Sequence, residues 1–326
     1  MTGTGDAVQG ARDAAMPLAP DRRRLLMAVR VTFVVALIAA CVATPGFFSV
    51  PNILSLLTTM SFMGCVAVGM TLITISGNIM SFSLGATAGA AAMVFIVALN
   101  IGGVAIGLVA ALAVAGLVSA AQGFAAGWVR ANPIIVSIAT SALIYGVAEI
   151  FAEHSSVYIK PGTGYEILRG KLGGVPLEFV VFLCVTAAGQ FILYLTRFGR
   201  NLYMIGSSFR AAEAAGVKTW RTVTGAYLWA GLFTGLAGVM LAIRYDGANM
   251  DYGAGYDYDA IAAVLVGGTL IKGGQGSALR TLAGAMIIAI VQALLLLLGF
   301  RQEWQYLITG LIVLAVIILH TSGDRR

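Results

Sequence analysis

The run GGVAIGLVAALAVAGLVSAAQGFAAG, residues 102–127, holds no charged side chain over a length sufficient to cross a bilayer. About 20 consecutive apolar residues form a transmembrane helix. Working outward from this run, further apolar segments with few charged side chains lie on both sides, at 25–44, 52–75, 81–99, 134–151, 178–196, 222–243, 258–271, 280–298 and 304–320. The sequence therefore predicts an all-α polytopic membrane protein with about ten transmembrane helices. The segment 258–271 is too short to span alone, and it reads as a half-helix lining a path.

Composition excludes the soluble classes of protein. Of 326 residues, 59% are hydrophobic and 10% are charged, and the mean hydropathy is +0.92. Soluble domains carry about 25% charged residues, so a soluble enzyme and a disordered chain are both excluded. The apolar runs leave no stretch for a separate soluble module. Cys41, Cys65 and Cys184 lie inside apolar runs, with neither a disulfide framework nor metal-ligand spacing.

The first apolar run has an alternative interpretation as a signal peptide. Arg22, Arg23 and Arg24 precede it, and Ile38-Ala39-Ala40-Cys41 resembles a lipoprotein cleavage box. The run has the length of a membrane span, however, and membrane-like segments follow it throughout. An uncleaved first helix is therefore the simpler interpretation.

Basic residues predict the orientation, because Lys and Arg concentrate in cytoplasmic loops. With the N-terminus inside, fifteen cations lie on the cytoplasmic side: Arg12, Arg22, Arg23, Arg24, Arg30, Arg130, Arg197, Arg200, Arg210, Lys218, Arg221, Lys272, Arg280, Arg325 and Arg326. Five lie outside: Lys160, Arg169, Lys171, Arg244 and Arg301. Both termini are thus predicted to be cytoplasmic, with tails at 1–24 and 321–326 flanking a transmembrane domain at 25–320. This asymmetry accounts for most of the net charge of +6, so a nucleic-acid partner is not predicted.

Acidic residues are predicted to gather on the outer side. Asp246, Asp251, Asp257 and Asp259 are expected to share one outer loop with Arg244, and the outer segment from Glu149 to Glu178 mixes both signs.

The predicted spans lack the chemistry of several classes of membrane protein. No span has a central Asp, Glu, Lys or Arg, which disfavours ion-coupled carriers and proton pumps, although a sodium site built from carbonyls and hydroxyls remains open. The segment 267–273 has glycines and Lys272 but lacks the Gly-Lys-Ser/Thr end of a nucleotide-binding loop. His154 and His320 are the two histidines, so no catalytic residue, metal site or cofactor is predicted. What remains is a permease that takes its energy from another protein.

A cytoplasmic loop at about 197–221 fits contact with such an energy source. Its centre, Phe209 to Val217, reads as a short alanine-rich helix closed by Gly216. A short rigid helix bearing Arg210 and Glu213 could transmit force from a soluble motor. A plain amphipathic connector on the lipid surface is equally compatible with the spacing.

Four ordered blocks give a resemblance to a known family. They are Gly69-Met70-Thr71-Leu72, Asn132 to Ser137, Gly206 to Gly216, and Asp259 to Thr269 (DAIAAVLVGGT) followed by Gly273-Gly274-Gln275-Gly276-Ser277. Together they are similar to the inner-membrane permeases of bacterial ABC importers for ribose and related monosaccharides. The blocks run from about residue 50 to the C-terminus.

The resemblance implies a multi-pass bacterial inner-membrane protein with several partners. These are a second permease subunit, identical or merely similar, two cytoplasmic ATPases and a periplasmic solute-binding protein. The outer segments around 160–171 and 246–259 would be offered to the binding protein. The coupling loop would act through Gly206, Phe209, Arg210, Ala211, Ala212, Glu213 and Gly216.

The glycines between residues 267 and 276 are expected to have a structural role. Gly267, Gly268, Gly273, Gly274 and Gly276 would permit a tight re-entrant turn or close helix packing. Contact with substrate is the alternative role, and we favour the packing role.

The sequence departs from the family at two places. Where the family has Gly-Gly-Ile-Asp-Leu-Ser-Val-Gly-Ser, this chain reads Gly77 to Ala86 (GNIMSFSLGA), with no Asp and one extra residue, and the usual Asn of the fourth helix is matched to Ala126. Asn78, Ser81 and Ser83 remain as candidate groups that line the pathway. Their alternative role is to cap the helix that begins near Ser81.

The function predicted from the sequence is the permease subunit of an ATP-driven importer for a pentose, hexose or related polyol. A nucleoside or a furanone-like signalling sugar is an alternative cargo. An ATP-independent facilitator and a non-transporting scaffold are the alternatives from other classes.

Overall fold

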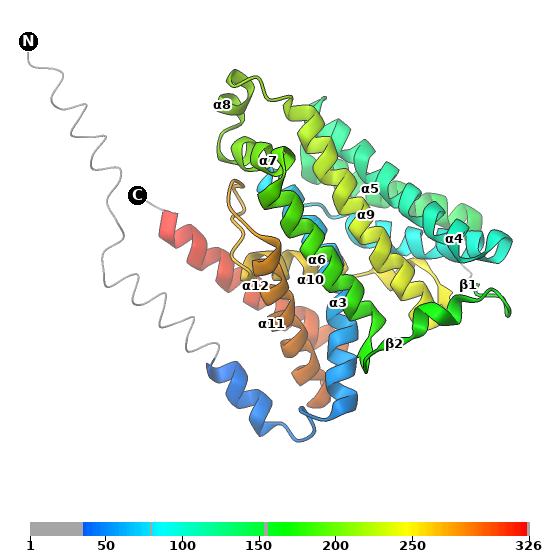
Figure 1. Ribbon diagram of the computed structural model, residues 1–326. Coiled ribbons are helices and arrows are strands. Elements are labelled where there is room, and N and C mark those ends of the chain that lie inside the picture. Colours follow the sequence, from blue (N-terminus) through cyan, green and yellow to red (C-terminus); the bar gives the residue numbers. More distant parts are fainter. Residues whose placement is uncertain (1–34, 79, 153–155, 325–326) are drawn as a thin grey trace, which may run out of the picture. The chain divides into compact units, whose positions relative to one another are not determined.

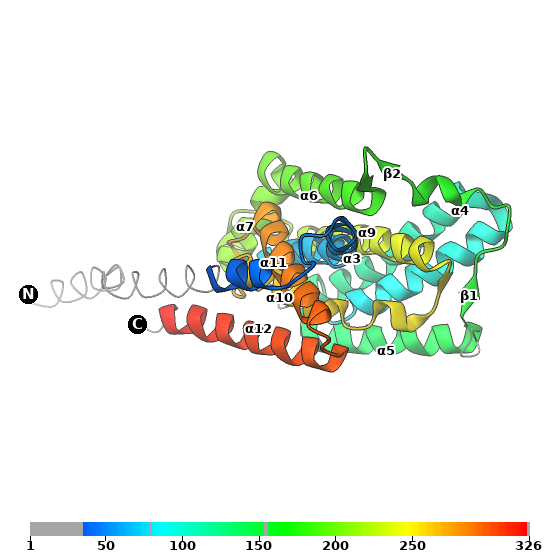
Figure 2. The ribbon, with the colours of Figure 1, turned by 90° about the horizontal axis from the view of Figure 1, so that it is seen from below.

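The computed structural model describes residues 35–78, 80–152 and 156–324 (Figures 1 and 2). These residues form two compact units. The main unit is 49–293, and the small unit combines residues before 49 with those from Leu294 onward. The predicted tail at 1–24 and most of the first predicted helix lie outside the described residues. Residues 35–43 of that helix are helical.

Six helices in the described residues are long and apolar enough to cross a membrane. They are α3 (Val50–Ile75), α4 (Leu84–Gly127), α5 (Pro133–Ala152), α6 (Leu177–Leu195), α9 (Thr219–Tyr245) and α11 (Ala278–Leu297). The last helix, α12 (Gln302–Asp324), has a shorter apolar part and continues past the predicted end at residue 320. Within the main unit α3 and α9 are mostly buried, whereas α5 is mostly exposed. The prediction of an all-helical polytopic membrane protein is confirmed.

The long helix α4 is a hairpin of two antiparallel arms. Gly103 interrupts it with φ 82° and ψ −178°, a conformation that glycine adopts without steric cost. The second arm runs back along the first. The two arms are in close contact, since a Cβ on Gly107 would lie 3.0 Å from the carbonyl oxygen of Phe95. The Ser83 hydroxyl, just before the first arm, lies 2.8 Å from the Gln122 carbonyl oxygen on the second. The hairpin thus contains the two predicted helices at 81–99 and 102–127.

Small residues let α9 pack directly on this hairpin. A methyl group on Gly231 would overlap the backbone of Ala115, and one on Gly238 would overlap that of Ala88. Such close approach of backbones is how helices associate in membranes, where lipid supplies no hydrophobic driving force between them. The hairpin and α9 therefore form the centre of the main unit.

Short strands gather at one end of the main unit, hereafter the strand end. Strand β1 (Val157–Tyr158) pairs antiparallel with β4 (Gly247–Ala248), and β2 (Lys171–Leu172) pairs with β3 (Val175–Pro176). The Asn100 side chain ties the first pair to the hairpin, since it donates to the Tyr158 carbonyl and accepts from the Lys160 amide. A 3-10 helix, η1 (Tyr165–Arg169), lies in the same connection.

The expectation of one outer loop holding four aspartates is wrong. Asp246 follows α9 at the strand end, but the chain then passes along α4 through the 3-10 helix η2 (Met250–Gly253). Asp257 and Asp259 lie in the first turn of α10 (Tyr256–Val266), and Asp259 is buried. A helix of 11 residues is about 16 Å long, so α10 is a half-helix, as its short apolar run predicted.

Candidate functional site

The predicted coupling loop contains two helices, and they mark the end of the main unit opposite the strand end, hereafter the α8 end. Helix α7 (Arg197–Ser207) precedes α8 (Phe209–Ala214). The sequence interpretation missed α7 because its charged residues lower its hydropathy. A helical signal was nevertheless present, since the apolar residues Leu202 and Ile205, three positions apart, are both buried.

Both ends of α8 are capped by local hydrogen bonds. The Ser208 hydroxyl accepts from the Ala211 amide, 3.3 Å away. At the other end the Gly216 and Val217 amides donate to the carbonyls of Glu213 and Ala212, with Gly216 at φ +78°. This is the Schellman arrangement that closes a helix with glycine. The short helix predicted within Phe209 to Val217, closed by Gly216, is therefore present as α8.

Arg130 fixes α8 against the loop that follows the hairpin. It forms an ion pair with Glu213, and its guanidinium lies over the Phe209 ring, 5.1 Å from the ring centre. Ala212 is buried, whereas Arg210 and Ala211 are exposed. Sequence reasoning counted Arg130 only as a topological charge, because its partner lies 83 positions away. Arg130 therefore joins α8 to the loop that follows the hairpin.

Four glycines join α7 to α3 and to the loop after α10. Gly77, Gly206, Gly273 and Gly274 lie backbone to backbone, and this set is hereafter the glycine contact. A methyl group on Gly206 would overlap the Ile75 carbonyl and the Gly274 amide, and Gly274 donates to the same Ile75 carbonyl at 2.9 Å. The structure thus brings Gly206 together with Gly273 and Gly274.

The remaining predicted glycines pack or turn nearby. A methyl group on Gly267 would meet the Arg280 carbonyl, one on Gly276 would meet the Thr269 side chain, and Gly268 has φ +81°. The Tyr203 hydroxyl donates to the Gly276 carbonyl at 2.8 Å. Burial raises the pKa of Tyr203 to about 12, so its hydroxyl keeps the proton that it donates.

Two of the candidate pathway residues lie inside the subunit. Ser81 and Ser83 are fully buried with their hydroxyls 3.0 Å apart, and both lie within hydrogen-bonding distance of Gln122. Asn78 has a different partner, because its amide donates to the Ser76 hydroxyl. Sequence reasoning missed Gln122 because it matched the family's amide to Ala126. The signal was Gln122 itself, directly before Gly123 in the same helix.

Removing Gln122 is expected to destabilise the hairpin. A Gln122→Met substitution keeps the side-chain length, but because the Ser81 and Ser83 hydroxyls can then bond only to each other, one of them is left without an acceptor. An unsatisfied buried group costs about 1–3 kcal/mol. We expect a lower unfolding temperature in detergent, whereas Gln302→Met, at an exposed position, should change it little. An unchanged unfolding temperature for Gln122→Met would contradict this account of the cluster.

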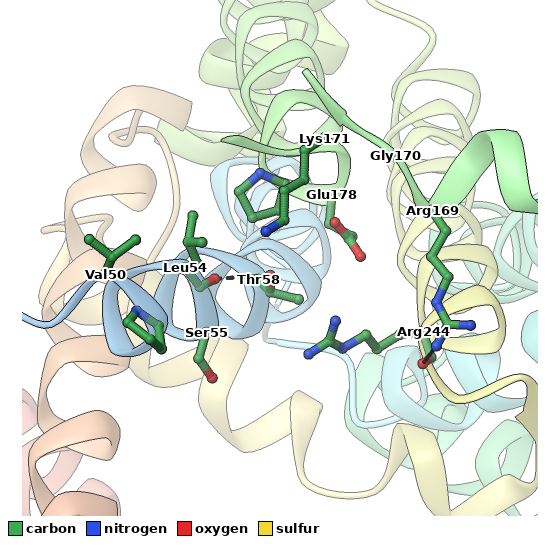
Figure 3. A pocket seen from close by; sticks show the side chains of 11 residues that line it. Val50, Leu54, Ser55, Thr58, Arg169, Gly170, Lys171, Glu178 and Arg244 are labelled. Carbon is green, nitrogen blue, oxygen red and sulfur yellow. Dashed lines mark hydrogen bonds between the residues drawn. The ribbon is translucent and has the colours of Figure 1, made fainter. Parts of the chain in front are cut away.

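A pocket of about 340 Å³ opens at the strand end (Figure 3). The cations Arg169, Lys171 and Arg244 line it with one acid, Glu178. Its remaining lining residues are Val50, Pro51, Leu54, Ser55, Thr58, Gly170 and Pro176. The pocket therefore carries an excess of positive charge over a partly apolar floor.

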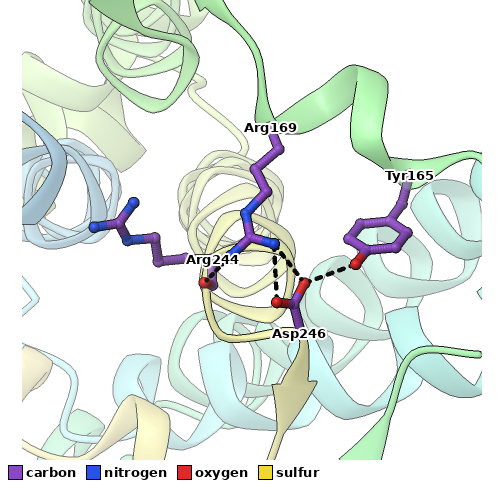
Figure 4. A network of polar contacts seen from close by, with 4 residues as sticks. All are labelled: Tyr165, Arg169, Arg244 and Asp246. Atoms are coloured by element: carbon purple, nitrogen blue, oxygen red, sulfur yellow. Dashed lines mark hydrogen bonds and ion pairs between the residues drawn. The ribbon is translucent and has the colours of Figure 1, made fainter.

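A polar network fixes one side of this pocket (Figure 4). Both carboxylate oxygens of Asp246 accept from Arg169, and the Tyr165 hydroxyl donates to the same carboxylate at 2.8 Å. The Arg244 side chain points away from Asp246 and toward the pocket (Figures 3 and 4). The network thus neutralises the charge of Arg169. The Arg244 guanidinium is left directed into the pocket, where it can contact a bound group.

Two helix starts meet inside the main unit. The Asp257 carboxylate, in the first turn of α10, accepts from the Gly85 amide at the start of α4, 2.7 Å away. One carboxylate thereby lies at two helix N-termini, where negative charge is favourable. Within residues 35–78, 80–152 and 156–324, no group of three or more His, Cys, Asp or Glu side chains is arranged to hold a metal ion.

Comparison with known proteins gives consistent matches over most of the chain. Residues 52–317 match the family model described as branched-chain amino acid transport system / permease component. The ribose import permease protein RbsC of Escherichia coli (strain K12) is 30% identical over 288 residues, 85% of this chain and 87% of that protein. The RbsC of Bacillus subtilis (strain 168) is 28% identical over 289 residues, covering 87% and 89% of the two chains.

A relative with another sugar in its name is equally similar. The L-arabinose transport system permease protein AraH of E. coli (strain K12) is 30% identical over 289 residues, 88% of each chain. No solved structure matches the chain significantly.

Proposed function

Because this chain belongs to the branched-chain amino acid transport system / permease component family, we propose that it is the membrane-spanning subunit of an ABC importer for a pentose or hexose. The cargo follows from relatives named for ribose and L-arabinose import. The observation that carries the coupling role is the structure of α8. This helix is capped at both ends, exposes Arg210 and is joined to the rest of the main unit by the Arg130–Glu213 ion pair. In this role α8 fits a groove of a separate cytoplasmic ATPase.

We further propose that the α8 end is cytoplasmic and that the strand end faces the periplasm. In the main unit, the predicted cytoplasmic cations are Arg130, Arg197, Arg200, Arg210, Lys218, Arg221, Lys272 and Arg280, against Lys160, Arg169, Lys171 and Arg244 outside. This distribution follows the positive-inside rule. Both termini are then cytoplasmic, with 1–24 as a tail, and a second permease subunit completes the pathway.

Force from the ATPase reaches the spans through the glycine contact in this proposal. Helix α8 directly follows α7, and Gly206 near the end of α7 lies backbone to backbone with the loop after α10 and the end of α3. Contacts between backbones leave no flexible side chain to absorb a displacement. The glycines Gly267, Gly268, Gly273, Gly274 and Gly276 then serve packing, and Asn78, Ser81 and Ser83 brace the wall of the pathway.

Transport by reconstituted components tests the proposed function. The chain is placed in liposomes with its ATPase and binding protein, and uptake of radiolabelled D-ribose, L-arabinose and D-galactose is measured with and without ATP. We expect ATP-dependent uptake of at least one sugar. Uptake without ATP would instead make the chain a facilitator, and uptake of a nucleoside alone would overturn the cargo.

We propose that the pocket at the strand end receives an acidic side chain of the solute-binding protein. Arg244 points into it, and its cations outnumber its acid. Charge complementarity of this kind speeds encounter and sets the register of docking.

Reversing the charge of Arg244 is expected to weaken this docking. An Arg244→Glu variant should lower binding-protein-dependent uptake by roughly tenfold, corresponding to about 1.4 kcal/mol. The measurement is initial uptake rate against binding-protein concentration at equal membrane amounts. Arg301→Glu, an exposed arginine predicted on the same side but outside the pocket, serves as the control. An Arg244→Glu variant that needs no more binding protein than the parent would contradict the docking role.

A further inference from the structure

One segment of the main unit without α-helix, which includes the 3-10 helix η2, runs beside a candidate membrane span. Residues 249–255 connect β4 to α10 and run beside the first arm of the hairpin. A Cβ on Gly89 would lie 3.0 Å from the Met250 carbonyl oxygen, and Gly85 and Gly253 lie backbone to backbone. Gly85 and Gly89 belong to the first turns of α4, a candidate membrane span by length and composition, so we place the segment that touches them at membrane depth.

Part of this segment is exposed on the surface of the subunit. Met250 and Gly253 are buried against the hairpin, whereas Asp251 and Ala254 are exposed. Irregular backbone at membrane depth is tolerated where protein buries it or where it lines a water-filled cavity, but not against lipid. A carboxylate in lipid is also unfavourable, so Asp251 does not face the hydrocarbon.

Two aromatic rings lie next to this segment along the chain or across its contacts, since Phe82 precedes Gly85, which touches Gly253, and Tyr258 follows Ala254 by four residues. Phe82, just before the hairpin, and Tyr258, in the first turn of α10, have ring centres 6.3 Å apart. Tyr258 is 62% exposed, although the residues that follow it, from Asp259 to Leu265, are buried. The Asp257 carboxylate accepts a hydrogen bond from the Gly85 amide, three residues after Phe82. This bond joins the start of α10, where Tyr258 lies, to the start of α4.

We infer that the face formed by Phe82, Asp251, Ala254 and Tyr258 lines the solute pathway and contacts the sugar. The rings offer an apolar surface to the C–H face of a pyranose or furanose, and the Asp251 carboxylate accepts hydrogen bonds from its hydroxyls. The identity of the solute rests on the proposed function. The exposure of this face to water rests on its own geometry.

Cysteine accessibility tests whether this face meets water. In a chain whose Cys41, Cys65 and Cys184 are replaced by alanine, Tyr258→Cys and Ala254→Cys are made singly. Both are treated in ruptured membranes with a charged methanethiosulfonate reagent, which reaches either side but does not enter lipid. We expect both to react at least tenfold faster than Leu143→Cys, which is apolar, 68% exposed and within the span α5.

Three results would overturn the inference in different ways. Reaction no faster than that of Leu143→Cys would place the face against lipid or protein. Spontaneous disulfides between two copies of Tyr258→Cys would make the face a subunit contact. The cysteines could also react rapidly without being slowed by D-ribose, L-arabinose or D-galactose, in a chain that transports one of these sugars. The face would then be lined by water but would not contact the sugar.

Transport kinetics supply the second readout. Tyr258→Ala is expected to raise the KM for the transported sugar at least tenfold, while Tyr258→Phe, which keeps the ring, restores most of it. An unchanged KM in Tyr258→Ala would also overturn the sugar contact. If none of the sugars is transported but the cysteines react rapidly, the proposed cargo fails and the water-lined pathway stands.

Discussion

A single methyl group at Gly206 is expected to reduce transport more than tenfold. In Gly206→Ala the new Cβ would overlap the Ile75 carbonyl and the Gly274 amide, which are backbone atoms and cannot rotate away. Overpacking a tight contact costs about 1–3 kcal/mol, and here relief requires α7 to separate from α3. The glycine contact would then open, and α8 would lose its connection to the spans.

The measurement is sugar uptake normalised to the amount of protein in the membrane, together with the unfolding temperature. Gly146→Ala is the matched control, because Gly146 also lies in a helix and a methyl group there meets no atom within 4 Å. We expect more than a tenfold loss for Gly206→Ala and parental uptake for Gly146→Ala. Parental uptake in Gly206→Ala would show that the glycine contact does not transmit movement.

Exchanging the charges of α8 is expected to uncouple the ATPase. In the double variant Arg210→Glu with Glu213→Arg, the exposed Arg210 position becomes acidic and the ion pair with Arg130 is replaced by repulsion. Uptake should be lost while the amount in the membrane stays the same, because surface charges contribute little to stability. Co-purification of the ATPase with the chain should fall in parallel.

A second pair of variants separates the roles of the two charges. Arg210→Glu alone changes only the outward surface, so it should release the ATPase. The exchange Arg130→Glu with Glu213→Arg keeps an ion pair within the subunit, so per molecule inserted in the membrane it should retain more ATPase binding than Glu213→Arg alone. Full transport by the Arg210→Glu, Glu213→Arg variant would remove the coupling role of α8.

The helices could be predicted because the membrane demands long apolar runs. The predicted range 222–243 became α9 (Thr219–Tyr245), and 178–196 became α6 (Leu177–Leu195). Hydropathy reads the average of a window, however, so it overlooked α7, where charged residues offset buried Leu202 and Ile205. It also could not show that the chain after Ala248 re-enters the protein, because two aspartates at the start of α10 resemble a loop.

Contacts between residues far apart in the sequence could not be predicted from local sequence patterns. The glycines of 267–276 were predicted to be structural, but the approach of Gly273 and Gly274 to Gly206 depends on the tertiary fold. The pairing of Arg130 with Glu213 and the bond from Gln122 to Ser83 likewise join residues on different elements. Composition around any one of these residues contains no information about its partner.

The turn at Gly103 has a consequence for how the protein enters the membrane. The arms of α4 reverse at this one interruption, so the strand end of the hairpin offers no polar loop for the insertion machinery to translocate. In the proposed orientation the two arms insert together, and the positive charge that stays on the cytoplasmic side sets their direction. That charge is Arg130, which follows the second arm and also binds α8. Replacing Arg130 by an acid thus threatens the insertion of the hairpin as well as the attachment of α8.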